Sequence, residues 1–125
     1  MTITTHEVDD IAVAEVSGQI NFQNTQTLKD LFGELEARNQ KAIVVDLKET
    51  EYIDGFGLSV LVNLSRSVYK GGGKLSLSCL NRELQRIFTK TKLDRWFDIY
   101  ESQEEACRKL KRGGGKPRTR ERKSA

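Results

Sequence analysis

Residues 42–59 read AIVVDLKETEYIDGFGLS and indicate a strand, a sharp turn and a helix in succession. The run AIVVDL at 42–47 is continuous in apolar residues, as in a central strand that is covered on both faces. Asp54 is predicted to cap the helix, because its side chain can accept hydrogen bonds from free backbone N–H groups. The helix should end at the glycines 71–73. Its apolar stripe comprises Leu58, Leu61, Val62, Val68 and Tyr69.

Further strands and helices alternate on both sides of this stretch. Residues 2–8 and 11–18 are rich in β-branched side chains and are separated by Asp9-Asp10, which predicts an opening hairpin. The remaining patterns predict helices from 24 to about 39, around 84–88 and from a capping box at 102–105 through 110, and strands at 74–80 and 96–100. The order β-β-α-β-α-β-α-β-α predicts one α/β domain, a mixed β-sheet with crossover helices.

The charge of the chain is unevenly distributed. Residues 1–110 hold 14 Lys/Arg and 17 Asp/Glu, whereas residues 111–125 hold 7 Lys/Arg and 1 Asp/Glu. We therefore expect a domain at 1–110 and a basic, disordered tail at 111–125, which lacks large apolar residues. The tail is either an arm that contacts an anionic surface or a solubilising end. It has no aromatic side chain to stack on bases, so no specific nucleic-acid binding is predicted.

Several kinds of site are not indicated. The two cysteines, Cys79 and Cys107, and the single histidine, His6, do not match a metal-ligand pattern, so no metal and no cofactor are predicted and the cysteines are expected to stay thiols. No acid, base and nucleophile converge in a readable pattern, which argues against an enzyme. The glycines before Lys74 follow a predicted helix, whereas the glycines of a phosphate-binding loop follow a strand.

The first residues lack a signal peptide and no apolar run is long enough to span a bilayer, so we expect a cytoplasmic protein.

Phe56 is the unusual residue of the turn. On a helical wheel with Leu58 at zero, Phe56 falls at about 160°, which predicts that it faces away from the core. Two interpretations remain open: an exposed anchor for a partner, or a ring that folds back against a neighbouring loop, for instance against Phe22.

At these residues the chain resembles a STAS domain of the bacterial anti-sigma factor antagonist type. The resemblance covers about residues 3–110. It is carried by VSGQIN at 16–21, VVDLKETEYIDGFGLSVLV at 44–62, the glycine turn before KLSLSC, and LQRIFTKTKLDRWFDIYES at 84–102. The central stretch is its specific part.

The resemblance implies a regulatory binding protein. Similar proteins bind an ATP-dependent anti-sigma factor kinase and displace the sigma factor, and phosphorylation of a Ser or Thr in the motif D-S-[ST]-G-L prevents that binding. Asp54, Gly57 and Leu58 match the motif, whereas Gly55 replaces its Ser and Phe56 replaces the phosphoacceptor. Asn21 also stands where the family often has Asp, in a loop expected beside this turn.

We therefore expect a non-enzymatic partner-switching protein that binds an anti-sigma factor of the kinase type and is not phosphorylated at position 56. Ser59 is the alternative phosphorylation site. The alternative function is a STAS subunit of a membrane transport or lipid-trafficking ATPase, or a ligand-sensing module. The predicted contact residues are Asn21, Phe22, Asp54, Gly55, Phe56, Gly57, Leu58 and Ser59.

Overall fold

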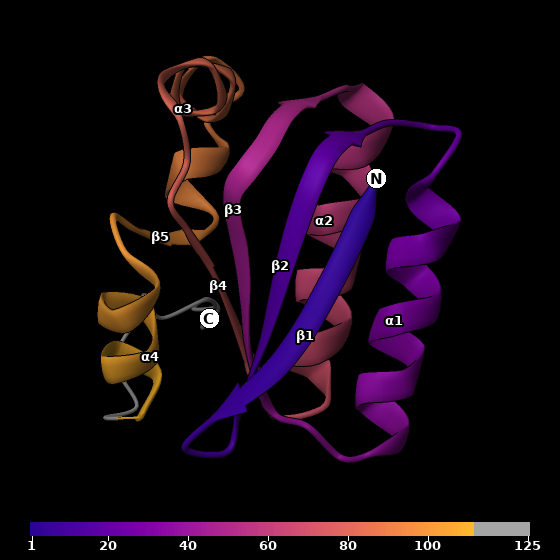
Figure 1. The fold of residues 1–125 in the computed structure, drawn as a ribbon, viewed down its shortest axis with the longest axis vertical. Helices are drawn as coiled ribbons and strands as arrows, with labels where there is room; N and C mark the ends of the chain where they lie inside the picture. Colours follow the sequence, from indigo (N-terminus) through magenta and orange to yellow (C-terminus); the bar gives the residue numbers. More distant parts are fainter. Residues whose placement is uncertain (112–125) are drawn as a thin grey trace, which may run out of the picture.

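The computed structural model describes residues 1–111, which form a five-stranded β-sheet with helices on both faces (Figure 1). The predicted element order is confirmed, with a short 3₁₀ helix, η1, added before the last strand. The bounds are β1 Thr2–Val8, β2 Ile11–Ile20, α1 Thr25–Ala37, β3 Ala42–Ile53, α2 Gly55–Lys70, β4 Lys74–Ser78, α3 Arg82–Lys90, η1 Leu93–Arg95, β5 Asp98–Tyr100 and α4 Gln103–Lys111. Of the predicted tail, only Lys111 lies within the described residues, and it ends α4.

The sheet is mixed, as predicted. The strands lie side by side in the order β1-β2-β3-β4-β5, with β1 antiparallel to β2 and every other pair parallel. Asp9 and Asp10 connect the hairpin and both have positive φ, 51° and 68°, the signature of a two-residue turn that matches strand twist. The predicted central strand, β3, is the third of the five.

Two apolar cores lie on opposite faces of the sheet. The larger core joins β2, β3 and β4 to α1, α2 and α3, while α4 covers a smaller core on the other face (Figure 1). The two central residues Val44 and Val45 point to opposite faces, and both are fully buried. This arrangement explains why the sequence of β3 is continuously apolar at its start.

The predicted strand bounds need four corrections. β2 runs to Ile20 instead of 18, because its last residues still pair with the end of β3. β3 runs to Ile53 instead of 47, because its polar second half still pairs with the end of β2 through the backbone. β4 ends at Ser78, where the following Cys79 takes a left-handed conformation with φ of 64°. β5 begins at 98, because the residues before it form η1.

The side of α2 that faces the core also differs from the prediction. The predicted stripe comprised Leu58, Leu61, Val62, Val68 and Tyr69, whereas α2 packs against α1 as well as against the sheet. The buried side is therefore centred nearer Leu61, which is fully buried. Tyr69, predicted to belong to the core stripe, lies at its edge in the last turn and is 43% exposed.

The glycine turn after α2 acts as a helix end, as predicted. Gly71 is the C-cap residue, and Gly72 has a positive φ of 87°. Gly73 passes so close to Lys41 that an added Cβ would meet the Lys41 carbonyl oxygen at 2.1 Å. The run of glycines is thus explained by backbone geometry.

Candidate functional site

The loop between β2 and α1 and the turn between β3 and α2 lie side by side at one end of the molecule. The Asp54 backbone N–H donates to the Ile20 carbonyl oxygen at 3.0 Å, and the Phe22 N–H donates to Asp54 Oδ2 at 3.2 Å. This confirms the expectation that the loop containing Asn21 borders the turn.

Asp54 caps α2 as predicted. Its Oδ1 accepts from the Gly57 N–H at 2.8 Å, and its backbone is extended, as is usual for an N-cap residue. Because Oδ2 receives the Phe22 N–H, one carboxylate fixes the helix start and the neighbouring loop relative to each other.

Gly57 is required by the close approach of α2 to the end of β2. A Cβ at this position would lie 2.8 Å from the Ile20 carbonyl oxygen and within 2.9 Å of the Ile20 and Ile53 side chains. Gly55, by contrast, has open space around it. Of the two glycines that flank Phe56, only Gly57 is thus fixed by packing.

Phe22 and Phe56 form an exposed aromatic pair. Their ring centroids lie 5.7 Å apart at an interplanar angle of 50°, within the range of favourable ring contacts. Phe22 is nevertheless 63% exposed and Phe56 64% exposed. The Phe56 ring faces away from the core, as predicted, and it also contacts Phe22, while its role as an anchor for a partner stays a prediction.

The other predicted contact residues are divided between surface and interior. Gly55 and Ser59 are exposed, and Asn21 is half-buried. Gly57 and Leu58 are buried in the described chain, and their place among the contact residues stays a prediction.

Two residues near the pair were missed. Asn24 organises the loop, because its Oδ1 accepts from the Asn21 N–H at 2.9 Å and its Nδ2 donates to the Gln19 carbonyl at 2.8 Å. Two asparagines three positions apart are a turn signal that could have indicated this role. Tyr52, near the end of β3, is 44% exposed and adds a third aromatic side chain at this end.

A second polar cluster joins α4 to the sheet. The buried Asp46 carboxylate accepts from the Gln103 side chain at 2.6 Å and from the Lys48 N–H at 2.8 Å. The thiol of Cys79 lies 3.8 Å from Asp46 Oδ2. Burial raises the pKa of Cys79, and the Asp46 carboxylate raises this pKa further. Gln103 also donates to Glu15 at 3.0 Å, so this contact positions α4.

The described residues offer few other sites. Cys79 and Cys107 are free thiols, as predicted. Within residues 1–111, no three metal-ligating side chains gather into a cluster. None of the helices in this part of the chain has the length and apolar character of a membrane span.

Comparisons with known proteins agree with this architecture. The STAS domain family matches residues 2–106. A Thermotoga maritima protein, named by inference as an anti-sigma factor antagonist, is 31% identical over 106 residues, which cover 84% of this chain and 94% of that protein. The anti-sigma-B factor antagonist of Bacillus subtilis is 33% identical over 91 residues, covering 73% and 82% of the two chains.

A solved structure is similar throughout the domain. The crystal structure of a Thermotoga maritima protein, also named by inference as an anti-sigma factor antagonist, superimposes on this chain with a TM-score of 0.82 at 29% identity. The superposition covers 87% of this chain and 94% of that protein. The family match spans most of the chain. The chain therefore belongs to the STAS domain family, and its relatives include proteins named anti-sigma factor antagonists.

Proposed function

We propose that this protein is a non-enzymatic, cytoplasmic antagonist that binds an anti-sigma factor of the ATP-dependent kinase type through the aromatic pair and is not controlled by phosphorylation at position 56. The exposed Phe56, packed on Phe22 where similar proteins carry a Ser or Thr, is the observation that carries this proposal. The names of the relatives support the choice of an anti-sigma factor as partner.

The geometry suits a binding anchor. The two rings already contact each other, and Asp54 holds both segments, so little side-chain freedom remains to be lost on association. Full burial of a Phe side chain is worth about 1.5–3 kcal/mol. Removing one ring should therefore weaken binding by about tenfold to a hundredfold.

The absence of a hydroxyl at position 56 also has a consequence for regulation. A phosphate would add close to two negative charges at the surface and could disrupt an apolar contact. Phe56 cannot accept a phosphate, so binding should persist in the presence of ATP. Ser59 is exposed in the first turns of α2 and is the remaining hydroxyl to exclude by experiment.

The first test measures binding. Each purified kinase-type anti-sigma factor encoded in the same genome is titrated with the wild-type chain, Phe22→Ala, Phe56→Ala and Tyr69→Ala. Tyr69 is a matched control, since it is an exposed aromatic residue on the same helix but at its other end. We expect one anti-sigma factor to bind, with affinity lost in both Phe variants and kept in Tyr69→Ala. Binding to none of them would refute the proposal.

The second test measures phosphorylation. The chain is incubated with the bound anti-sigma factor and ATP, and its intact mass is measured beside Phe56→Ser and Ser59→Ala. We expect no mass gain in the wild type and the gain of one phosphate in Phe56→Ser, which restores a hydroxyl at the motif position. A stoichiometric phosphate on the wild type that is lost in Ser59→Ala would move the regulation to Ser59 and contradict this part of the proposal.

A further inference from the structure

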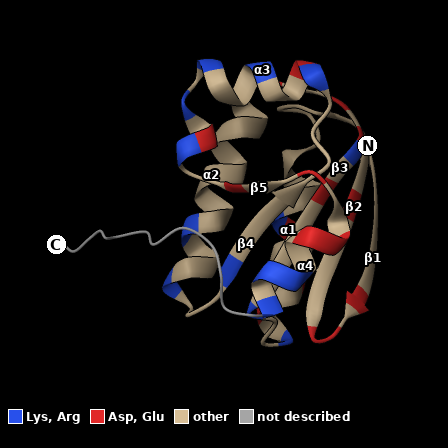
Figure 2. Ribbon diagram, turned by 90° about the vertical axis from the view of Figure 1, so that its left-hand side faces the viewer, with Lys and Arg blue, Asp and Glu red and all other residues tan. Residues whose placement is uncertain are grey.

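Positive charge is concentrated in the segment that contains α3 and η1. Residues 82–95 hold five Lys/Arg and two Asp/Glu, a net charge of +3, whereas the rest of residues 1–111 holds ten Lys/Arg and fifteen Asp/Glu, a net charge of −5. Figure 2 shows the Lys and Arg positions along α3. The segment is therefore a basic surface on an otherwise acidic domain.

Three cations form a row along the exposed side of α3. Arg82, Arg86 and Lys90 are four residues apart and exposed, while Leu84 and Phe88 pack into the core on the opposite side. Like charges at this spacing repel each other and destabilise a helix. We refer to these three residues as the α3 row.

The domain itself provides little compensation for this repulsion. Glu83 lies 3.5 Å from the Arg86 guanidinium, and both side chains are more than half exposed, so solvent weakens this pair. Within residues 1–111, Arg82 and Lys90 form no ion pair. The row costs stability in the isolated domain, and an external anionic surface would offset that cost.

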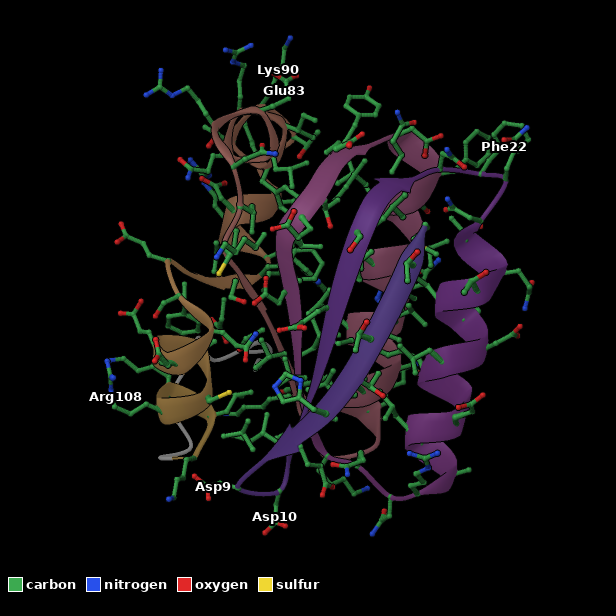
Figure 3. All side chains as sticks on the ribbon, viewed as in Figure 1. Asp9, Asp10, Phe22, Glu83, Lys90 and Arg108 are labelled. Carbon is green, nitrogen blue, oxygen red and sulfur yellow. The ribbon has the colours of Figure 1, made fainter. Side chains whose placement is uncertain are left out.

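The α3 row lies at the same end of the molecule as the aromatic pair. The N-cap residue of α3, Asn81, donates from its side chain to the Thr50 carbonyl at 3.1 Å, which attaches the start of α3 to the last residues of β3. Asp54, which begins the turn to α2, follows Thr50 by four positions in the sequence. In Figure 3, Lys90 and Phe22 lie at one end, and the acidic turn Asp9-Asp10 lies at the opposite end.

We propose that the partner is an acidic protein whose surface contacts the α3 row and borders the apolar site that receives Phe22 and Phe56; this inference rests on the proposed function. A protein is favoured over nucleic acid for two reasons. The rings are tilted against each other by 50° and leave no flat platform for stacked bases. The row spans only about 12 Å, too short to follow a phosphate backbone over a normal binding site.

The main experiment compares association rates. The variant Arg82→Glu/Arg86→Glu/Lys90→Glu in the full chain is measured against the anti-sigma factor that binds the wild type, at about 50 mM and about 300 mM salt. The matched control is Lys29→Glu/Arg38→Glu/Lys109→Glu, which makes the same change in charge at exposed positions elsewhere. Circular dichroism checks that both variants are folded.

We expect the α3 variant to slow association by about tenfold or more at low salt, because attraction between opposite charges steers the encounter. This effect should shrink at high salt, and the control should change the rate far less. Equal rates for the two variants would overturn the inference. Since wild-type binding and its loss in Phe56→Ala are measured in the same series, the proposed function can hold while this inference fails.

A defined probe tests the surface independently of the anti-sigma factor. Amide spectra of the ¹⁵N-labelled chain are recorded with hexaglutamate and, separately, with a DNA duplex of about 16 base pairs. Shifts from hexaglutamate at residues 82–95 that vanish in the α3 variant support an acidic partner surface. No shift there, or a stronger response of these residues to the duplex, overturns the inference.

Discussion

At the scale of single residues, Asp54 connects the two halves of the candidate site. Its two carboxylate oxygens accept from Gly57 at the helix start and from Phe22 in the loop. We expect Asp54→Ala to lower the free energy of unfolding by about 1–2 kcal/mol, as is typical for loss of an N-cap. Urea unfolding measures this, with Asp30→Ala, a carboxylate with one exposed hydrogen bond to Gln26, as the control. Equal losses in the two variants would argue against the linking role.

Gly57 allows the start of α2 to pack closely against the ends of β2 and β3. A methyl group at this position would collide with the Ile20 backbone and two Ile side chains, while Gly55 has room for one. We expect Gly57→Ala to destabilise the protein by about 1–3 kcal/mol, the usual cost of overpacking. Gly55→Ala should be neutral or slightly stabilising, because it only restricts the unfolded chain. If chemical denaturation gives both variants the same stability, the close contact at Gly57 does not exist in solution.

At the scale of elements, the attachment of α4 to the sheet places a carboxylate beside a thiol. The pKa of Cys79 is raised first by burial and then by the Asp46 carboxylate, since a nearby negative charge disfavours the thiolate. Asp46→Asn removes that charge and should lower the pKa of Cys79. The pKa should stay above its ordinary value, because the burial remains. At a given pH, alkylation of Cys79 should therefore become faster.

The rate of reaction with iodoacetamide as a function of pH measures this change, in a chain that carries Cys107→Ser. Cys107 provides the control in a Cys79→Ser chain, because its raised pKa comes from burial and Asp9. Asp46→Asn should leave the pH dependence of Cys107 alkylation unchanged. A Cys79 profile that does not move, or moves to higher pH, would contradict the assigned cause.

The elements themselves were largely predictable, because each depends on a local pattern. Apolar periodicity and caps predicted all four α-helices and five strands but not the short 3₁₀ helix η1, and the wheel position of Phe56 correctly predicted its exposure. The second half of β3 was missed, since its polar residues pair through the backbone and leave no apolar signal. The contact between Asp54 and Phe22 joins residues 32 positions apart, and that between Asp46 and Gln103 joins residues 57 apart. Such pairings depend on the complete fold and cannot be recognised in short stretches.

At the scale of the whole molecule, the net charge of +3 divides into two opposite parts. Residues 1–111 hold 15 Lys/Arg and 17 Asp/Glu, for −2, and residues 112–125 hold 6 Lys/Arg and 1 Asp/Glu, for +5. Near an anionic bilayer, each Lys or Arg contributes roughly 1 kcal/mol of attraction. Six such residues within 14 positions make this segment the main basic region of the chain.

We therefore expect the full chain to bind vesicles that contain phosphatidylserine, and deletion of 112–125 to reduce this binding by about tenfold or more. Co-sedimentation with vesicles measures the bound fraction, which should fall at high salt because surface charges are screened. A chain with residues 112–125 in scrambled order is the matched control and should still bind, since charge rather than order provides the attraction. If vesicle binding survives the deletion, the lipid-binding surface lies in the folded domain. The α3 variant would then show whether that surface is the α3 row.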